Sequence, residues 1–160
     1  MAYQKLQASR ALAVIPSDTI NIPNVSATAA SGTTTSTGAN RLIDSSATFL
    51  DDNIKKGDIV YDTTNNVVTT VVEVENDNGL AVVTAIASGA DYVVYSQRDI
   101  PSNGCTLYVG GLGDVIVLTA GGDTVEFENV PAGTFMPVQA VRVYATGHTT
   151  AAATNLVALW

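Results

Sequence analysis

Short runs of Val, Ile, Thr and Tyr dominate the hydrophobic pattern of this chain, and Gly- and Asn-rich segments separate them. Apolar residues at the helical spacing of i, i+3, i+4 and i+7 are rare, apart from a possible helical turn at Ala47 to Ile54. Runs of this kind, bounded by turn residues, predict β-strands. The predicted strands are 12–15, 59–61, 67–74, 81–84, 92–95, 106–110, 115–119, 125–130, 135–144 and 155–159.

Residues that favour turns lie between these predicted strands. The turn candidates are Asn78-Gly79, Asn103-Gly104, Gly110-Gly111, Gly121-Gly122-Asp123 and Ala132-Gly133. We interpret the longer sequence Gly110-Gly111-Leu112-Gly113 as a hairpin turn. Strands about ten residues apart with Gly-rich joints are typical of sandwiches and barrels. We therefore predict an all-β fold, with a β-sandwich or barrel module and a second small, β-barrel-like inserted module.

The composition changes at two places and divides the chain. One change is the Ser/Thr/Ala/Gly tract at 26–40, and the other lies near 96–101. We predict that residues 1–25 and 98–160 form one β-module together, that 26–40 is a linker, and that 41–97 is the inserted module. The tract has no bulky apolar residue, which favours a disordered linker. An extended chain ordered against a neighbouring subunit is the alternative.

The negative charge of the chain limits the classes of partner that it can bind. Seven Lys and Arg against fifteen Asp and Glu give a formal net charge of -8, which repels phosphate backbones and anionic lipids. We expect neither nucleic acid nor a membrane as a partner. No apolar run is long enough to cross a bilayer, and the first ten residues lack the apolar region of a signal peptide. We expect synthesis in a host cytoplasm.

Candidate reactive residues are few. The single cysteine, Cys105, and the single histidine, His148, cannot build a zinc site of the usual His/Cys kind, and no motif surrounds either residue. We expect Cys105 to be a small buried residue. We predict no catalytic, metal-binding or cofactor-binding residues, no cofactor and no enzymatic activity.

The acidic residues suggest a solvated surface. The segment 51–62 lacks the alternating ligands and closing Glu of a calcium loop. Glu73 and Glu75 alternate with Val72 and Val74, as on the solvent face of a strand. A hydrolase acting on surface polysaccharide would need a pair of carboxylates at a cleft, and none can be assigned.

Several longer stretches resemble a known family. They are Cys105-Thr-Leu-Tyr-Val-Gly-Gly-Leu-Gly-Asp-Val, Thr119-Ala-Gly-Gly-Asp-Thr-Val-Glu-Phe, Asn129-Val-Pro-Ala-Gly-Thr-Phe-Met-Pro-Val-Gln, Thr154-Asn-Leu-Val-Ala-Leu-Trp and, near the N-terminus, Ile15-Pro-Ser-Asp-Thr-Ile-Asn-Ile-Pro. Together they resemble small virion proteins of tailed phages and gene transfer agents, a family that includes the base of the head spike. The chain departs from the family's pattern by the insertion between Asn24 and about Gln97. Within it, Arg41-Leu-Ile-Asp-Ser-Ser-Ala-Thr-Phe-Leu resembles a β-module of phage structural proteins.

The resemblance implies a structural protein on the head surface of a virion, a capsid decoration (cement) protein or a spike-base subunit. Its implied partners are the major capsid protein or neighbouring virion proteins, and copies of itself in a trimer or pentamer. The alternative is a tail or fibre component whose inserted module binds a receptor. That alternative needs an exposed aromatic patch, for which Tyr61, Tyr92 and Tyr95 are the candidates.

Both ends of the chain are candidate contact regions. The first ten residues hold a local positive excess in Lys5 and Arg10, with Tyr3 and Leu6 as apolar neighbours, and they could form an arm on an adjacent virion protein. A frayed tail is the alternative. Trp160 closes an apolar C-terminal strand and is expected either in the core or in a subunit contact.

Overall fold

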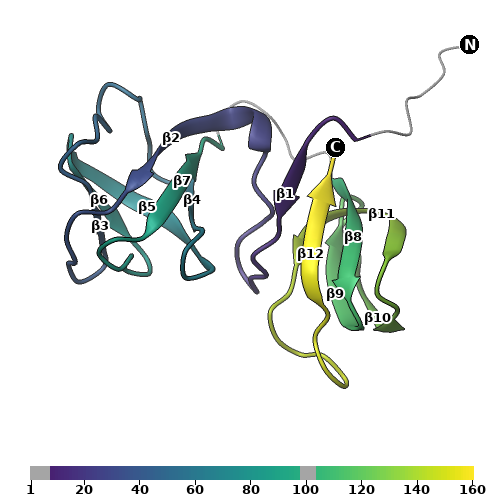
Figure 1. The fold of residues 1–160 in the computed structure, drawn as a ribbon. Helices are drawn as coiled ribbons and strands as arrows, with labels where there is room; N and C mark the ends of the chain where they lie inside the picture. The colour runs from purple at the N-terminus through teal and green to yellow at the C-terminus, as the bar shows by residue number, and fades with distance from the viewer. Residues whose placement is uncertain (1–7, 98–103) are drawn as a thin grey trace, which may run out of the picture. The chain divides into compact units, whose positions relative to one another are not determined.

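The fold was determined as a computed structural model, which describes residues 8–97 and 104–160. Over these residues the chain forms two antiparallel six-stranded sheets, and the only helical segment is the single 3-10 turn η1 (Val25–Ala27). The predicted all-β fold class is confirmed. The described residues belong to two compact units, a terminal unit of 8–22 and 104–160 and an inserted unit of 23–97 (Figure 1).

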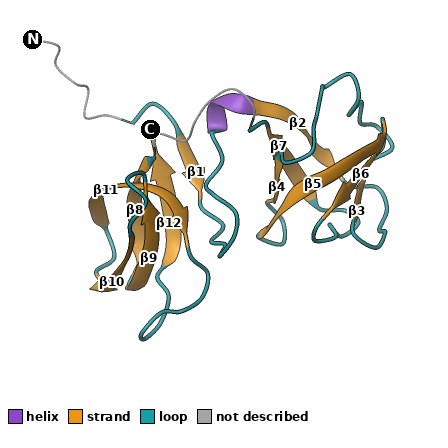
Figure 2. Cartoon of the chain, turned by 180° about the vertical axis from the view of Figure 1, so that it is seen from behind, coloured by secondary structure: helices purple, strands orange, loops and turns teal. Residues whose placement is uncertain are grey.

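The terminal unit is built from both ends of the chain. Its strands are β1 (Ala11–Ala13), β8 (Cys105–Gly111), β9 (Gly113–Thr119), β10 (Thr124–Val130), β11 (Thr134–Val143) and β12 (Thr154–Leu159). They are ordered β1-β12-β8-β11-β9-β10. The edge strand β1 pairs antiparallel with the C-terminal strand β12, as Figure 2 shows.

Strand β11 holds the two halves of this sheet together. Its first residues, Thr134 to Met136, pair with β8, whereas Arg142 and Val143 pair with β9 after a shift of register. A register shift of this kind bends a strand and increases its twist. The sheet therefore curls at β11 and encloses a core.

Our interpretation of Gly110 to Gly113 as a hairpin turn is wrong, because β8 and β9 are not neighbours and β11 lies between them. The glycines instead allow the chain around residues 151–155 to pack closely. A Cβ at Gly110 would lie 2.7 Å from the Asn155 carbonyl oxygen, and one at Gly113 would lie 2.5 Å from the Ala153 nitrogen. Close backbone approach, not turn conformation, requires these glycines.

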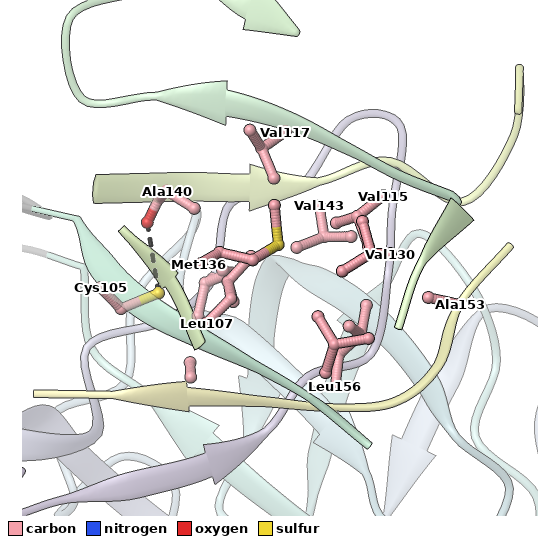
Figure 3. Packing of buried hydrophobic residues seen from close by; sticks show 13 residues of the cluster. Cys105, Leu107, Val115, Val117, Val130, Met136, Ala140, Val143, Ala153 and Leu156 are labelled. Carbon is pink, nitrogen blue, oxygen red and sulfur yellow. Dashed lines mark hydrogen bonds between the residues drawn. The ribbon is translucent and has the colours of Figure 1, made fainter. Parts of the chain in front are cut away.

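The core of the terminal unit takes alternate residues of its strands (Figure 3). Leu107, Val109, Leu156 and Ala158 are buried, whereas the residues between them are not. The buried set is Ile22, Cys105, Leu107, Val109, Val115, Val117, Val130, Met136, Ala140, Val143, Ala153, Leu156 and Ala158. This alternation follows from the period of two along a β-strand.

The inserted unit has its own sheet and core. Its strands are β2 (Thr28–Thr33), β3 (Arg41–Ile43), β4 (Ile59–Asp62), β5 (Val67–Asn76), β6 (Gly79–Val82) and β7 (Asp91–Tyr95), in the order β2-β7-β4-β5-β6-β3. The long strand β5 pairs first with β4 and then, from Val71, with β6, and two register shifts interrupt the β5–β6 pairing. Its core residues are Leu42, Phe49, Ile54, Val60, Val71, Leu80, Val82, Ile86, Ala90, Tyr92 and Val94.

The predicted linker at 26–40 is wrong, because the tract contains β2 and pairs with β7. Ala29 and Ala30 pack against the core of the inserted unit. The buried Thr34 hydroxyl donates to the Ala87 carbonyl and accepts from the Ala90 amide. Small side chains and backbone hydrogen bonds therefore order this tract without a bulky apolar residue. The possible helical turn at 47–54 is a series of turns, with Asn53 at a φ of 56°.

Candidate interaction surface

Two of the five predicted contact residues lie together at the paired chain ends. The Trp160 amide donates to the Arg10 carbonyl, and the amides of Ser9 and Arg10 donate to the Trp160 carbonyl. Trp160 is partly buried and packs against the core of the terminal unit. Arg10 is exposed. The other three predicted residues, Tyr3, Lys5 and Leu6, lie outside the described residues.

The side of β1, β12, β8 and β11 that points away from the core forms a further surface. One row crosses all four strands in register: Ala13 lies beside Val157, Val157 beside Tyr108, and Tyr108 beside Phe135. Phe135 is 62% exposed, and its ring centroid lies 5.1 Å from that of Tyr108. We call this surface the outer face. It consists of Ala11, Ala13, Thr106, Tyr108, Gly110, Phe135, Asn155, Val157 and Leu159.

The outer face has no charged residue, and the acids of the terminal unit lie elsewhere. Glu126 and Glu128 lie on β10, Asp123 lies in the β9–β10 turn, and Asp114 lies on β9. The terminal unit therefore has an uncharged half formed by the strands β1, β12, β8 and the start of β11, with the exposed Arg10 directly before β1 at its edge. Its acidic half is formed by β9 and β10.

Sequence analysis missed the outer face. The alternation within 106–110 and 155–159 could have indicated it, because the outward positions there hold Thr106, Tyr108, Val157 and Leu159 without a charge. Which strands lie beside one another could not be inferred, since β8 pairs with β12 and β11 far along the chain.

Three carboxylates of the terminal unit, from β9, β10 and the segment after β1, hold the loop between β11 and β12 in place. Each accepts a hydrogen bond from a loop amide and from the hydroxyl of a threonine of the loop. Asp18 binds Thr146, Glu126 binds Thr149, and Asp114 binds Thr150. The loop also meets β9, because the Tyr144 amide donates to the Ile116 carbonyl. These acids are therefore partners of the fold.

Hydrogen bonding stabilises the charged form of two of these carboxylates. The Thr146 hydroxyl, followed by the Thr146 amide, lowers the pKa of Asp18. The amides of Asn129 and Thr150 lower the pKa of Asp114, which is 1% exposed. Both groups remain anionic at neutral pH.

Buried aspartates have the same role in the inserted unit. Asp62 accepts from the amides of Thr64 and Asn65, and Asp44 accepts from the Ser46 amide and the Tyr92 hydroxyl. Burial raises the pKa of Asp44, but the hydrogen bonds from Ser46 and Tyr92 lower it more, so the net pKa is lowered. These carboxylates fix turns and cross-strand contacts.

The solvated face expected for Glu73 and Glu75 is present with one difference. Both residues are exposed, but Glu75 accepts three hydrogen bonds from Nε and Nη2 of Arg41, with an ion-pair distance of 2.6 Å. Val72 is also 43% exposed, because β5 shifts register between Val71 and Glu73. The strict alternation expected there is interrupted by this bulge.

The aromatic patch that a receptor-binding inserted module requires is not formed by its candidates. Tyr61 and Tyr92 are each 2% exposed, and Tyr95 is 6% exposed. Tyr61 packs edge-on against Tyr95, and Tyr92 packs against Phe49. All three tyrosines are buried, and Tyr92 belongs to the core of the inserted unit.

The two residues considered for chemistry lie in ordinary structural positions. Cys105 is buried, its thiol donates to the Ala140 carbonyl, and burial raises its pKa to about 12. His148 lies in the loop between β11 and β12. Among the described residues, no three His, Cys, Asp or Glu side chains come together as metal ligands do. None of the described helical segments is long and apolar enough to span a bilayer.

Comparison with known proteins gives no relative. No family model, no curated protein and no solved structure matches this chain.

Proposed function

We propose that this chain is a structural protein of a phage virion. In this role it binds the head surface as a capsid decoration (cement) protein or a spike-base subunit, without catalysis. The observation that carries the proposal is the division of the terminal unit into an uncharged half with exposed Phe135 and an acidic half. Such a division suits a module with one side docked and the other in solvent. The sequence resemblance described above supports the same role.

The hydrogen bonding within both units supports a structural role. The buried carboxylates and Thr hydroxyls have partners within the fold, as in the Asp44–Tyr92 and Asp114–Thr150 contacts. Among the described residues no buried side-chain nitrogen or oxygen atom is without a hydrogen bond. Polar groups that are satisfied in this way rigidify a domain.

The proposed partners are the major capsid protein or neighbouring virion proteins, together with copies of this chain in a trimer or pentamer. A shell presents many equivalent positions, so single contacts of modest strength add up when subunits bind together. The first ten residues, with Tyr3, Lys5, Leu6 and Arg10, are proposed as an arm that assists this binding. Arg10 is part of the paired ends, so an arm deletion should stop at residue 7.

The test is electron microscopy of particles assembled without this protein and after it is added back. We expect intact heads that lack a surface feature, and recovery of that feature with the full-length chain. Heads that keep every surface feature, or particles that lose only their tails or fibres, would contradict the proposal. A chain that lacks residues 2–7 should restore the feature with lower occupancy in competition with the full-length chain.

A further inference from the structure

We infer that residues 2–6 of the proposed arm of one copy add as a further strand to the open edge of β10 in a neighbouring copy. The inference deepens the proposed assembly into a trimer or pentamer, on which its biological role rests, but the contact itself can be measured on the free protein. It starts from the place of β10 as the last strand of its sheet.

The outer edge of β10 is open. Among the described residues, no backbone hydrogen bond joins β10 to a strand other than β9. Alternate amide and carbonyl groups of an edge strand point away from its neighbour. They form a template on which another strand can pair.

Charge distinguishes β10 from the other edge strands. The strands β1 and β2 have no charged residue and β3 has only Arg41, whereas β10 has Glu126 and Glu128. Glu126 holds Thr149 of the loop between β11 and β12. Glu128 is exposed, and its carboxylate has no hydrogen bond or ion pair within the described part of the chain. Two β10 edges would bring like charges together, so the edge favours a strand that carries a cation.

The two sides of β10 differ in chemistry. Glu126 and Glu128 lie on one side of the strand, and Val125 and Phe127 lie on the other. Phe127 packs against the core of the terminal unit, and Val125 is 40% exposed. A strand that fits this edge therefore needs a cation on one side and an apolar residue on the other.

The sequence of residues 2–6, Ala-Tyr-Gln-Lys-Leu, meets both requirements. In an extended strand Lys5 shares one side with Tyr3, and Leu6 shares the other with Ala2. A pairing that places Lys5 on the side of Glu128 therefore places Leu6 on the apolar side of β10. No acid precedes Asp18 in the chain, so this segment brings no like charge to the edge.

The reach of the segment favours a neighbouring copy over its own β10. Within one copy, four strands lie between β1 and β10, and five steps of about 4.8 Å make roughly 24 Å along the sheet. The Ser9 amide is tied to the Trp160 carbonyl beside β1. About three residues, or roughly 10 Å of extended chain, lead from Ser9 to Leu6. A copy whose β10 lies against the β1 edge is within this reach.

The symmetry of this contact suits the proposed trimer or pentamer. The contact joins two different surfaces, a segment of the arm and a strand edge. Each copy gives its arm to the next copy and accepts the arm of the copy before it. Contacts of this head-to-tail kind form a closed ring when the rotation between copies allows it.

The experiment uses charge reversal on the full-length chain. Lys5→Glu places a negative charge opposite Glu128, and Glu128→Lys places a positive charge opposite Lys5. We expect the wild type to self-associate in sedimentation at low salt over about 0.01 to 1 mM, and each single variant to associate about tenfold more weakly. The double variant Lys5→Glu/Glu128→Lys restores opposite charges, so it should regain the association of the wild type.

Two matched controls carry the same changes of charge in the inserted unit. Lys56→Glu and Glu73→Lys alter exposed residues away from β10, and both should associate like the wild type. Circular dichroism spectra should show that all variants are folded.

Three results would overturn the inference. The first is a wild type that stays monomeric at about 1 mM, as it would if the arm paired with its own β10. The second is association that the single reversals leave unchanged, and the third is a double variant that does not regain it. Each of these would leave the proposed function intact if the wild type still restored the surface feature of particles. A chain that self-associates as expected but binds no particle would contradict the proposed function and not this contact.

Discussion

Single asparagines and aspartates shape the loops of this chain. All five non-glycine residues with positive φ among the described residues are asparagines: Asn40, Asn53, Asn66, Asn129 and Asn155. Asparagine tolerates this conformation better than other side chains, because its short amide can bond locally to the backbone. Aspartate side chains also accept hydrogen bonds from turn amides, as Asp62 does from Thr64 and Asn65.

Gly32 provides a test at the residue scale. A Cβ at this position would lie 2.5 Å from Asp44 Oδ2 and 2.9 Å from the Tyr92 hydroxyl oxygen, so it would disturb their buried hydrogen bond. We expect Gly32→Ala to lower the free energy of unfolding by about 1–3 kcal/mol, the usual cost of an overpacked site. The measurement is urea unfolding followed by circular dichroism.

Gly121→Ala is the matched control for Gly32→Ala. A Cβ at Gly121 has its nearest contacts at 3.6 Å, and its φ is not positive. This substitution should leave stability unchanged or raise it by about 0.4–1 kcal/mol, because alanine restricts the unfolded chain. Equal effects of the two substitutions would show that the space beside Asp44 is not what requires Gly32.

The contact role predicted for Tyr3, Lys5, Leu6, Arg10 and Trp160 stays a prediction. Arg10 and Trp160 are brought together by the pairing of the chain ends, and Trp160 packs against the core, one of its two predicted places. Phe135 was not selected, because an outward aromatic residue in a strand cannot be told from a buried one without knowledge of the register. Its place beside Tyr108 depends on β11 pairing with β8.

At the scale of elements, most strands with bulky apolar residues were predicted, whereas the short β3 and the Ala/Ser/Thr-rich β2 were not. The runs around β4, β5, β7 and β8 to β12 hold Val, Ile, Tyr or Phe at alternate positions, and they form strands. Strand β2, with the sequence Thr-Ala-Ala-Ser-Gly-Thr, has neither bulk nor alternation. It is ordered by pairing with β7, a long-range interaction that leaves no local pattern.

The loop between β11 and β12 gives a prediction of pH dependence. The pKa values of Asp18 and Asp114 are lowered in the folded chain from 3.8, so the folded state binds protons less readily than the unfolded state. Their contribution to stability is complete above the unfolded pKa and is lost as pH falls through the folded pKa. We expect the urea midpoint to be level between pH 7 and about 5 and to fall below about pH 4.

The substitution Asp114→Asn tests whether the loop between β11 and β12 contributes to the decrease of the urea midpoint at low pH. The amide keeps one acceptor but has no charge, so it should weaken the contacts to Asn129 and Thr150 at neutral pH. We expect a lower urea midpoint at pH 7 and a smaller decrease toward pH 2 than in the wild type. If the variant kept the full pH dependence, other carboxylates would account for it.

At the scale of the whole molecule, the two sheets are built in the same way around one long strand each. In each sheet a strand of ten residues, β5 or β11, pairs with one neighbour over its first part and with another further along, and register shifts interrupt this pairing. Each sheet therefore curls around its own core. The arrangement of strands could not be inferred from sequence, because only the register of these long strands sets it.

Separate cores predict separate folding. The fragment 23–97 contains all six strands and the whole buried cluster of the inserted unit. We expect this fragment to be folded alone, with dispersed amide NMR signals and a single cooperative unfolding transition, although small domains are only marginally stable. A fragment without cooperative unfolding would show that the inserted unit depends on the rest of the chain.

Because β1 pairs with β12, the terminal unit is suited to circular permutation. The Ser9 amide nitrogen and the Trp160 carbonyl oxygen are 2.6 Å apart, so the first and last residues of the terminal unit's sheet lie together at its β1 edge. A short peptide could therefore join them, and the chain could be opened instead at Gly122 in the β9–β10 turn, where a Cβ would meet no atom within 4 Å. Such a circular permutant would keep every strand neighbour while it moved both free ends from the uncharged half of the terminal unit to its acidic half.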